Sequence, residues 1–398
     1  MTRQRLVSHA RSAAGLAEFG ARPKVELHRH LEGAVRLSTV LDLAQRHGVA
    51  LPHGDEGGTT PAPKLTLEGI RPHIQTLAPF PNLETLLDIF SHTQSTFGSV
   101  DAFERIAREA VLDAHEEGIR LLELRYAPSF ASIGHGYEFN EVLEAVQEGV
   151  RAGQRELGGA EEIGVGLICI GVGAMGPEEM QKTTDFFLER QDAFCGFDMA
   201  GAETNVLQHA DCFRRVREAG GKITCHASED LVEGIPANAL NAVEVLGAER
   251  VGHGIQIVKD RDVMDRLRER DVLLEVSVTS NWLTAAVGPH IRDHPVRKLW
   301  EHGIKVQPNT DDPGIMGIDL NNEWHVWKHE LGFSDEELDA MQMLALERSF
   351  LGEAEKERLW ARHFAEQSAL EVIGGTMADA IMAAKEVHCA ACSQNKST

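Results

Sequence analysis

The chain has 398 residues, of which 39 are basic and 62 acidic, giving a formal net charge of −23 at pH 7. Nucleic acids and anionic membrane surfaces are bound through basic patches, so this acidity argues against both as partners. Hydrophobic residues make up 42% of the chain, yet no run approaches the roughly 20 consecutive apolar residues of a membrane span. The six cysteines are few for this length and are typical of free thiols in a reducing compartment. We therefore expect a globular cytoplasmic protein.

Residues 1–21 are predicted to form an N-terminal arm. The segment contains several arginines but no apolar stretch followed by a small-residue cleavage site, so it lacks the features of a secretory signal. Residues 22–370 are expected to form a single domain. Residues 371–398 are expected to hold the end of a C-terminal helix and a disordered tail.

From about residue 22 onward, short apolar runs alternate with amphipathic helical patterns. Eight runs have the length and composition of buried strands: Lys24–His30, Arg120–Tyr126, Ile163–Val172, Phe194–Met199, Lys222–His226, Arg250–His253, Val272–Val276 and Ile304–Asn309. Helical segments between them include Asn140–Glu156, Glu178–Arg190, Leu207–Ala219, Ala237–Leu246, Arg261–Glu269 and His294–Glu301. This alternation favours an α/β fold of the (β/α)8 TIM-barrel type over a doubly wound sheet. The first connection, Leu31–Gly118, is much longer and predicts a helical insertion that could cover the barrel mouth.

The first predicted strand ends in His28 and His30, separated by one residue. Side chains along a strand alternate between its two faces, so the two imidazoles point the same way. Two imidazoles on one face can be ligands of a single divalent metal. Unrelated histidines explain such a pair at least as well in a chain that contains 19 of them, so the pattern alone leaves both interpretations open.

Three later strand ends carry residues of the same chemical kinds. The fifth strand ends at His226 with Glu229 just beyond, the sixth ends at His253, and the eighth is followed by Asp311 and Asp312. The C-terminal ends of barrel strands converge on one mouth. Three histidines and a carboxylate suit zinc or a similar first-row metal with an open position for water. The remaining groups can then move protons in a hydrolysis.

The chain resembles the metal-dependent adenosine deaminases of the amidohydrolase superfamily, especially the bacterial enzymes. The likeness covers about residues 22–365 and is carried by five ordered motifs: His-x-His-Leu-Glu-Gly at 28–33, Met-Ala-Gly-Ala-Glu at 199–203, His-Ala-Ser-Glu at 226–229, Gly-His-Gly at 252–254 and Asn-Thr-Asp-Asp-Pro at 309–313. A weaker match is Leu-Glu-Leu-Arg-Tyr-Ala-Pro at 122–128. Together these motifs are highly specific.

The resemblance implies one Zn²⁺ per subunit, held by four ligands: His28, His30, His226 and Asp311. It implies that Glu229 protonates the purine ring nitrogen N1 while a metal-activated water attacks C6. His253 would orient that water and stabilise its charge, and Asp312 would fix it and contact N7. Binuclear relatives commonly use a lysine at the end of the fourth strand as a bridging carbamate. This chain has none there, which favours one metal.

The resemblance also implies four substrate contacts: His30, Glu32, Gly201 and Asp312. Gly201 matches a backbone contact to purine N3, and Glu32 takes the place of a carboxylate that meets the nucleoside sugar. The expected reaction is the hydrolysis of adenosine and 2'-deoxyadenosine to inosine and 2'-deoxyinosine plus ammonia. The partner is then a small-molecule purine nucleoside, and the oligomeric state is left open.

Three positions differ from the commonest adenosine deaminase pattern. Glu32 and Ala202 each stand where Asp is usual, and Ser228 stands where Gly is usual, which is costly if that position needs a positive φ. Relatives that deaminate free adenine or aminodeoxyfutalosine often carry Glu at the first of these positions. Those two compounds therefore stay open as alternative substrates, whereas Gly252 favours adenosine.

A metal-binding barrel that has lost its catalytic power is a further alternative. Structural metal binding alone would not require Glu229, His253 and Asp312, so their presence favours an enzyme. Cys389 and Cys392, taken with the distant HxE of the first motif, superficially match the signature of cytidine-type zinc deaminases. That signature belongs to a compact site, and here most of the chain separates its two halves.

Overall fold

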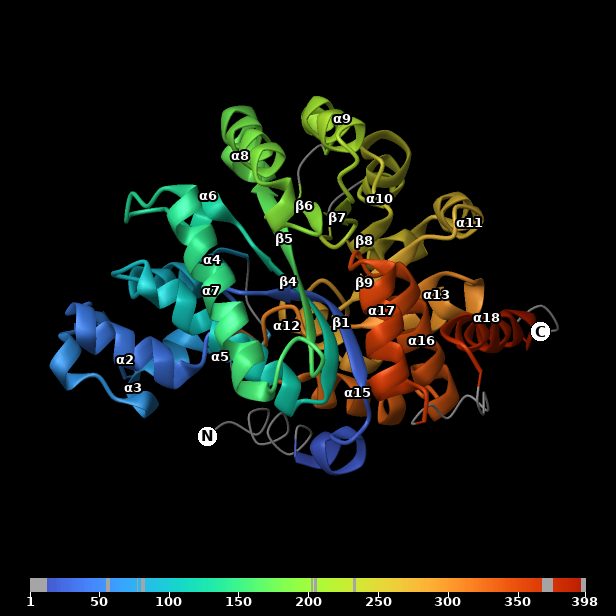
Figure 1. Cartoon of the computed structure of the whole chain (residues 1–398), viewed down its shortest axis with the longest axis horizontal. Coiled ribbons are helices and arrows are strands. Elements are labelled where there is room, and N and C mark those ends of the chain that lie inside the picture. The colour runs from blue at the N-terminus through green and yellow to red at the C-terminus, as the bar shows by residue number, and fades with distance from the viewer. Residues whose placement is uncertain are drawn as a thin grey trace.

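The computed structural model describes residues 13–54, 58–76, 78–79, 83–201, 203, 206–231, 234–366 and 375–394. Eight parallel strands form its centre (Figure 1): β1 (Lys24–His30), β4 (Ile119–Tyr126), β5 (Gly164–Val172), β6 (Gly196–Ala200), β7 (Thr224–Ala227), β8 (Arg250–His253), β9 (Leu273–Val276) and β10 (Lys305–Pro308). All eight predicted strands are present, and β1 and β8 have the predicted bounds. The strands are buried on both faces, and their apolar residues form much of the core.

The eight strands close into a barrel. Backbone hydrogen bonds join them in the orders β1-β4-β5-β6 and β10-β9-β8-β7. At one seam Arg29 pairs with Asp311, whose backbone N–H donates to the His28 carbonyl over 3.0 Å. At the other seam Phe197 pairs with Ile223. The predicted (β/α)8 TIM barrel is therefore confirmed.

Charged side chains inside the barrel neutralise one another. The Arg125 guanidinium lies 2.8 Å from Asp198 Oδ2 and 2.7 Å from Glu275 Oε2, and Arg250 pairs with Glu275 and Glu123. All five side chains are fully buried. A buried charge is costly unless it is paired and hydrogen-bonded, so loss of any one of these side chains would leave a partner with an unpaired buried charge. Through Asp198 and Glu275 it reaches the C-terminal ends of the strands.

Helices form the layer outside the strands (Figure 1): α5 (Asp101–Glu116), α7 (Phe139–Leu157), α8 (Pro177–Glu189), α9 (Ala210–Glu218), α10 (Pro236–Asn241), α11 (Arg261–Glu269), α13 (Val296–His302), α16 (Asp335–Arg348) and α17 (Glu353–Leu359). The Asp260 side chain accepts hydrogen bonds from the first turn of α11, which explains the predicted start of that helix. Two predicted helices are less regular than expected. Residues 207–219 begin with the 3-10 turn Val206–His209, and residues 237–246 end in the π-helical turn Ala242–Leu246.

The long connection between β1 and β4 is the predicted helical insertion. It contains α2 (Leu37–His47), a small hairpin of β2 (Leu51–Pro52) and β3 (Thr59–Thr60), α3 (Leu67–Ile74) and α4 (Leu83–Ser95) ahead of α5. Ile89 of α4 packs against Leu283 and Ile315, which lie in the short helices that follow β9 and β10. The Thr76 backbone N–H also donates to the Ile315 carbonyl over 2.7 Å. The insertion therefore lies at the C-terminal end of the barrel.

Short helices at that same end connect strands to the outer layer: α6 (Pro128–Ala131), α12 (Val278–Leu283), α14 (Pro313–Met316) and α15 (Leu320–His329). None of the helices within the described residues has the length and apolar character needed to cross a lipid bilayer.

The two terminal segments pack onto the barrel where they are described. Residues 13–19 are helical, and the buried ring of Phe19 lies 5.4 Å from that of Trp324. At the other end, α18 (Met377–Gln394) packs against α13 and α16. Cys389 and Cys392 lie in this helix, far from the strand ends (Figure 1). Residues 1–12 and 395–398, which include most of the expected tail, lie outside the described residues, so the domain limits stay predictions.

Candidate metal centre

Four side chains from three strand ends meet at the barrel mouth. His28 and His30 come from β1, His226 from β7, and Asp311 lies just after β10. One ligand atom from each lies within 4.8 Å of the others. Asp311 Oδ1 is 3.2 Å from Nε2 of both His28 and His30, and the Nε2 atoms of His30 and His226 are also 3.2 Å apart. The four residues expected to be metal ligands thus form one compact cluster.

Two buried carboxylates hold the outer nitrogens of these imidazoles. His28 Nδ1 lies 2.9 Å from Glu275 Oε2, and His226 Nδ1 lies 3.1 Å from Asp198 Oδ2. A ligating histidine commonly donates its second N–H to a carboxylate, which fixes the ring and leaves the other nitrogen facing the metal. Burial alone would raise the pKa of Asp198, but the facing His226 ring and the Arg125 guanidinium hold it below its usual range. This donor set fits a divalent first-row metal.

The backbone around the cluster is strained at three non-glycine residues. Asp311, His253 and Ser228 have φ angles of 65°, 59° and 57°, which L-residues adopt at a cost of roughly 1–2 kcal/mol. Ser228 stands where the related family usually has Gly, and its positive φ explains that preference. The Ser228 hydroxyl donates to the Ile235 carbonyl over 2.7 Å and accepts from Ala239 N–H over 2.9 Å, which helps to hold the conformation.

Glu229 lies beside the cluster, next to His253. Burial raises the pKa of its carboxyl well above the usual range, and the charge on Asp311 adds to this effect. Its Oε2 atom is 3.5 Å from His253 Nε2. The turn that carries it is held by Glu203, whose carboxylate accepts from the backbone N–H groups of Ser228 over 2.6 Å and Glu229 over 3.0 Å.

His253 faces the cluster from the end of β8. Its Nε2 atom is 3.9 Å from Asp311 Oδ2, and its Nδ1 atom is 3.0 Å from the Asn281 side-chain nitrogen. Burial lowers the pKa of His253 well below its usual value, so the ring is neutral. A neutral imidazole with one N–H can donate one hydrogen bond toward the centre.

The remaining predicted residues lie around the same mouth. Burial raises the pKa of Asp312, and the neighbouring Asp311 charge raises it further. Gly33 has no room for a Cβ, which would lie 1.7 Å from Asp312 Oδ1. Glu32 is buried, its Oε1 accepts from Ala127 N–H over 3.0 Å, and burial raises its pKa to about 7.

Gly201 follows β6 with a φ of 99° and, with Met199 and Val206, lines a small hollow that reaches His226. Ala202 lies outside the described residues. The structure thus brings together every site residue named from the sequence, while their roles stay predictions.

Several residues of this centre were not predicted from the sequence. Asp198 and Glu275 could have been predicted, because each is the only carboxylate in an otherwise apolar strand and a buried charge needs a partner. Asn281 and Ser280, whose hydroxyl donates to Asp311 Oδ2 over 2.7 Å, follow β9, a strand end that has no histidine. Glu203 lies in a recognised motif, but its contacts with the turn after β7 are visible only in three dimensions.

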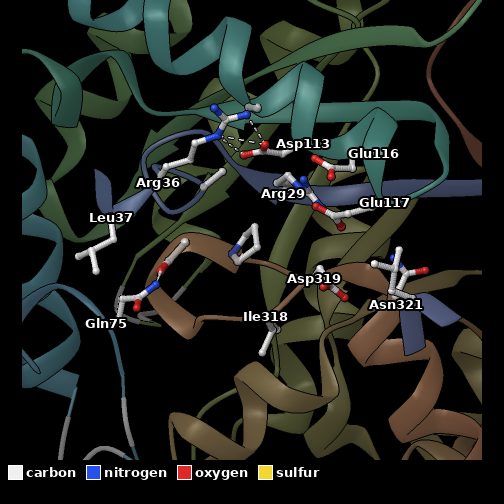
Figure 2. A pocket seen from close by; sticks show the side chains of 15 residues that line it. Arg29, Arg36, Leu37, Gln75, Asp113, Glu116, Glu117, Ile318, Asp319 and Asn321 are labelled. Atoms are coloured by element: carbon white, nitrogen blue, oxygen red, sulfur yellow. Dashed lines mark hydrogen bonds and ion pairs between the residues drawn. The ribbon is translucent and has the colours of Figure 1, made fainter. Parts of the chain in front are cut away.

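A separate cavity of about 280 Å³ lies on the outer side of β1 (Figure 2). Arg29, the residue between His28 and His30, lines it and pairs there with Glu117 over 2.7 Å. Arg36 and Asp113 form a second pair on its wall. None of the predicted ligand or proton-transfer residues lines this cavity.

The sequence matches a known protein family. The sequence profile of the family described as "Adenosine deaminase" matches residues 23–363. An adenosine deaminase from Shigella flexneri is 35% identical over 342 residues, which cover 85% of this chain and 96% of that protein.

Two solved structures have the same fold. The adenine deaminase of Arthrobacter aurescens has 26% identity and a TM-score of 0.75, covering 86% of this chain and 98% of its own. An amidohydrolase from Burkhoderia ambifaria with bound Zn has 25% identity and a TM-score of 0.75, covering 95% of both chains.

Proposed function

Because the chain belongs to the adenosine deaminase family, whose members are metal-dependent hydrolases of C–N bonds in purines, we propose that its substrates are adenosine and 2'-deoxyadenosine. Water replaces the 6-amino group, so a C6–O bond forms, the C6–N bond breaks, and inosine or 2'-deoxyinosine and ammonia leave. The observation that carries this proposal is the convergence of Glu229, His253 and Asp312 on the four-residue cluster of metal-binding side chains.

One Zn²⁺ per subunit is the proposed metal, with His28, His30, His226 and Asp311 as its ligands. The carboxylates behind His28 and His226 support this, because they leave the inner nitrogens facing the cluster. When bound, Zn²⁺ lowers the pKa of a coordinated water to about 7 and so supplies a nucleophile at neutral pH. The zinc in the Burkhoderia amidohydrolase is consistent with this choice.

The chain's own residues supply the proton and the orientation. Glu229, whose pKa burial raises well above its usual range, gives its proton to purine N1 and so relieves the charge that attack at C6 pushes into the ring. His253 donates a hydrogen bond toward the attacking oxygen. Asp312 contacts N7 and holds the same oxygen, and Gly201 leaves its backbone open to N3.

Glu32 makes a smaller substrate the second candidate. It is one methylene longer than the usual aspartate, and its Oε1 accepts a hydrogen bond from Ala127 N–H, so its fit to a nucleoside sugar should differ. Adenine is therefore the alternative substrate, in line with the likeness to an adenine deaminase, and aminodeoxyfutalosine belongs to the same alternative.

We also propose a cytoplasmic location, supported by six free cysteines.

A substrate panel with the zinc-loaded protein tests the proposal. We expect the highest kcat/KM with adenosine and 2'-deoxyadenosine, measured by the loss of the adenosine absorbance band and by ammonia release. Glu32→Asp is the matched variant and should change kcat/KM for nucleosides more than for adenine. Turnover of adenine or aminodeoxyfutalosine without turnover of adenosine would show that the substrate assignment is wrong.

A further inference from the structure

Two buried polar residues, Asn281 and His294, lie directly behind the proposed catalytic groups. Asn281 is on α12, and His294 precedes α13 after the 3-10 turn Ile291–Asp293. Their exposed fractions are 0% and 4%. Neither belongs to the metal cluster, yet Asn281 contacts both His253 and Glu229. A buried amide with such neighbours must have a defined orientation.

A backbone group fixes the direction of the hydrogen bonds. The Val296 N–H points at His294 Nδ1 over 3.2 Å, and a backbone amide can only donate, so Nδ1 carries no hydrogen. Burial lowers the pKa of His294 to about 3, so the ring is neutral. Its single hydrogen is therefore on Nε2, which lies 3.2 Å from the side-chain oxygen of Asn281 and donates to it.

The orientation of Asn281 then follows. Because its oxygen accepts from His294, its NH2 group faces the other way. That nitrogen lies 3.0 Å from His253 Nδ1 and 3.1 Å from Glu229 Oε1, so its two hydrogens serve two acceptors. His253 Nδ1 must be unprotonated to accept, which places the hydrogen of its neutral ring on Nε2.

We propose that Asn281 and His294 are positioning residues that fix the tautomer of His253 and the orientation of the Glu229 carboxyl. The hydrogen on His253 Nε2 points toward the centre, where that ring donates rather than accepts. Glu229 Oε1 accepts from Asn281, which leaves Oε2 as the oxygen that faces His253 Nε2 over 3.5 Å. The direction of every hydrogen bond in this series is thus fixed by the Val296 backbone N–H, which donates to His294. The kinetic part of this inference rests on the proposed deaminase function, whereas the tautomer part does not.

Substitutions at these two residues separate positioning from packing. Asn281→Asp keeps the size but presents an acceptor to His253, so the hydrogen should move to Nδ1. We expect kcat for adenosine to fall about 100-fold or more, the scale of a misplaced acid–base group, with zinc content and KM little changed. His294→Gln can still donate to Asn281 and should keep most of the activity. His294→Leu cannot donate and should resemble Asn281→Asp.

The tautomer itself is measured by 1H–15N NMR of the zinc-loaded protein with 15N-labelled histidine, with His253 signals assigned from the spectrum of His253→Asn. We expect a protonated Nε2 on His253 in the wild type and in His294→Gln, and a protonated Nδ1 in Asn281→Asp. A protonated Nδ1 in the wild type would overturn the proposal. So would an unchanged kcat in Asn281→Asp. If adenosine is not a substrate, the deaminase function fails, but the NMR result still decides the tautomer.

Discussion

At the scale of single residues, the pKa values of five carboxyl groups around the metal centre are shifted in different directions because their neighbours differ. Asp198 and Glu275 face guanidinium and imidazole groups, which hold the pKa of each carboxyl down despite burial. Glu229 and Asp312 face other carboxylates, and burial raises the pKa of both. Asp311 is held ionised by the adjacent imidazoles. Such a separation of carboxyl pKa values suits a site in which one carboxyl group gives a proton while another stays anionic.

Glu229→Gln removes the acid and leaves the metal ligands unchanged. We expect the bound zinc to stay at one per chain and kcat for adenosine to fall about 100-fold or more, because the amide has no proton of suitable acidity for N1. Metal analysis of the purified variant, run beside the activity assay, separates the two effects. Loss of the zinc would show instead that Glu229 is a ligand.

Asp198→Asn tests the carboxylate behind His226. The variant keeps its size but loses the charge that faces His226 and Arg125, so metal affinity should fall about 10- to 100-fold. Competition with a chromophoric chelator measures this change. Asp185→Asn is the control, because Asp185 pairs with Arg215 at the surface and should not alter affinity. Equal affinities of the two variants would count against the role of Asp198.

At the scale of elements, the strands were predictable because each is short, apolar and bounded by turns, and the site was predictable because strand ends of a barrel converge. The Asn281–His294 pair was not predictable, because α12 is a six-residue helix and the pair's contacts depend on where two loops fold back. The β2–β3 hairpin is too short to give a pattern. The 3-10 turn before α9 and the π-helical turn after α10 also have no distinctive amino-acid composition, so the sequence could not predict them.

Helix α18 should respond to acid through His388. This side chain is 7% exposed, and its ring lies 4.1 Å from that of Trp300. Burial, with a contribution from Lys305, lowers its pKa from 6.5 to about 4. The unfolded chain binds a proton below about pH 6.5 but the folded chain only below about pH 4. Stability should therefore fall by up to about 3 kcal/mol as pH decreases through this window.

Thermal unfolding at pH 7 and pH 5 checks the role of His388. His388→Phe keeps an aromatic ring on Trp300 but cannot titrate, so its midpoint should fall less between the two pH values than the wild-type midpoint. The exposed His47→Phe serves as the control and should follow the wild type. Parallel behaviour of all three proteins would show that His388 does not titrate in this range.

At the scale of the whole molecule, the metal centre lies where the barrel closes. Arg29 pairs with Asp311, just after β10, at the seam between β1 and β10. His28 and His30, on either side of Arg29, and Asp311 itself are proposed ligands. A bound metal therefore ties the first strand of the barrel to the last, while His226 adds a third strand. Closure of the barrel brings the proposed ligands of the first and last strands together.

Removal of the metal should loosen the barrel at this seam. Binding at a concentration 1,000 times Kd stabilises a folded protein by about 4 kcal/mol, so chelation should lower the thermal midpoint. Hydrogen exchange of the metal-free protein should increase first in β1 and β10 and least in β4 and β5. An unchanged midpoint and uniform exchange, with metal loss verified, would contradict a structural role for the ion.

The most direct test of the deaminase assignment is mass analysis of the products formed from adenosine in H2(18)O by the zinc-loaded protein. We predict inosine that carries one oxygen-18 at C6 and an equal amount of ammonia, with no product from the metal-free protein. Recovery of unchanged adenosine under conditions where adenine is consumed, or cleavage of the glycosidic bond with the amino group retained, would contradict the assignment.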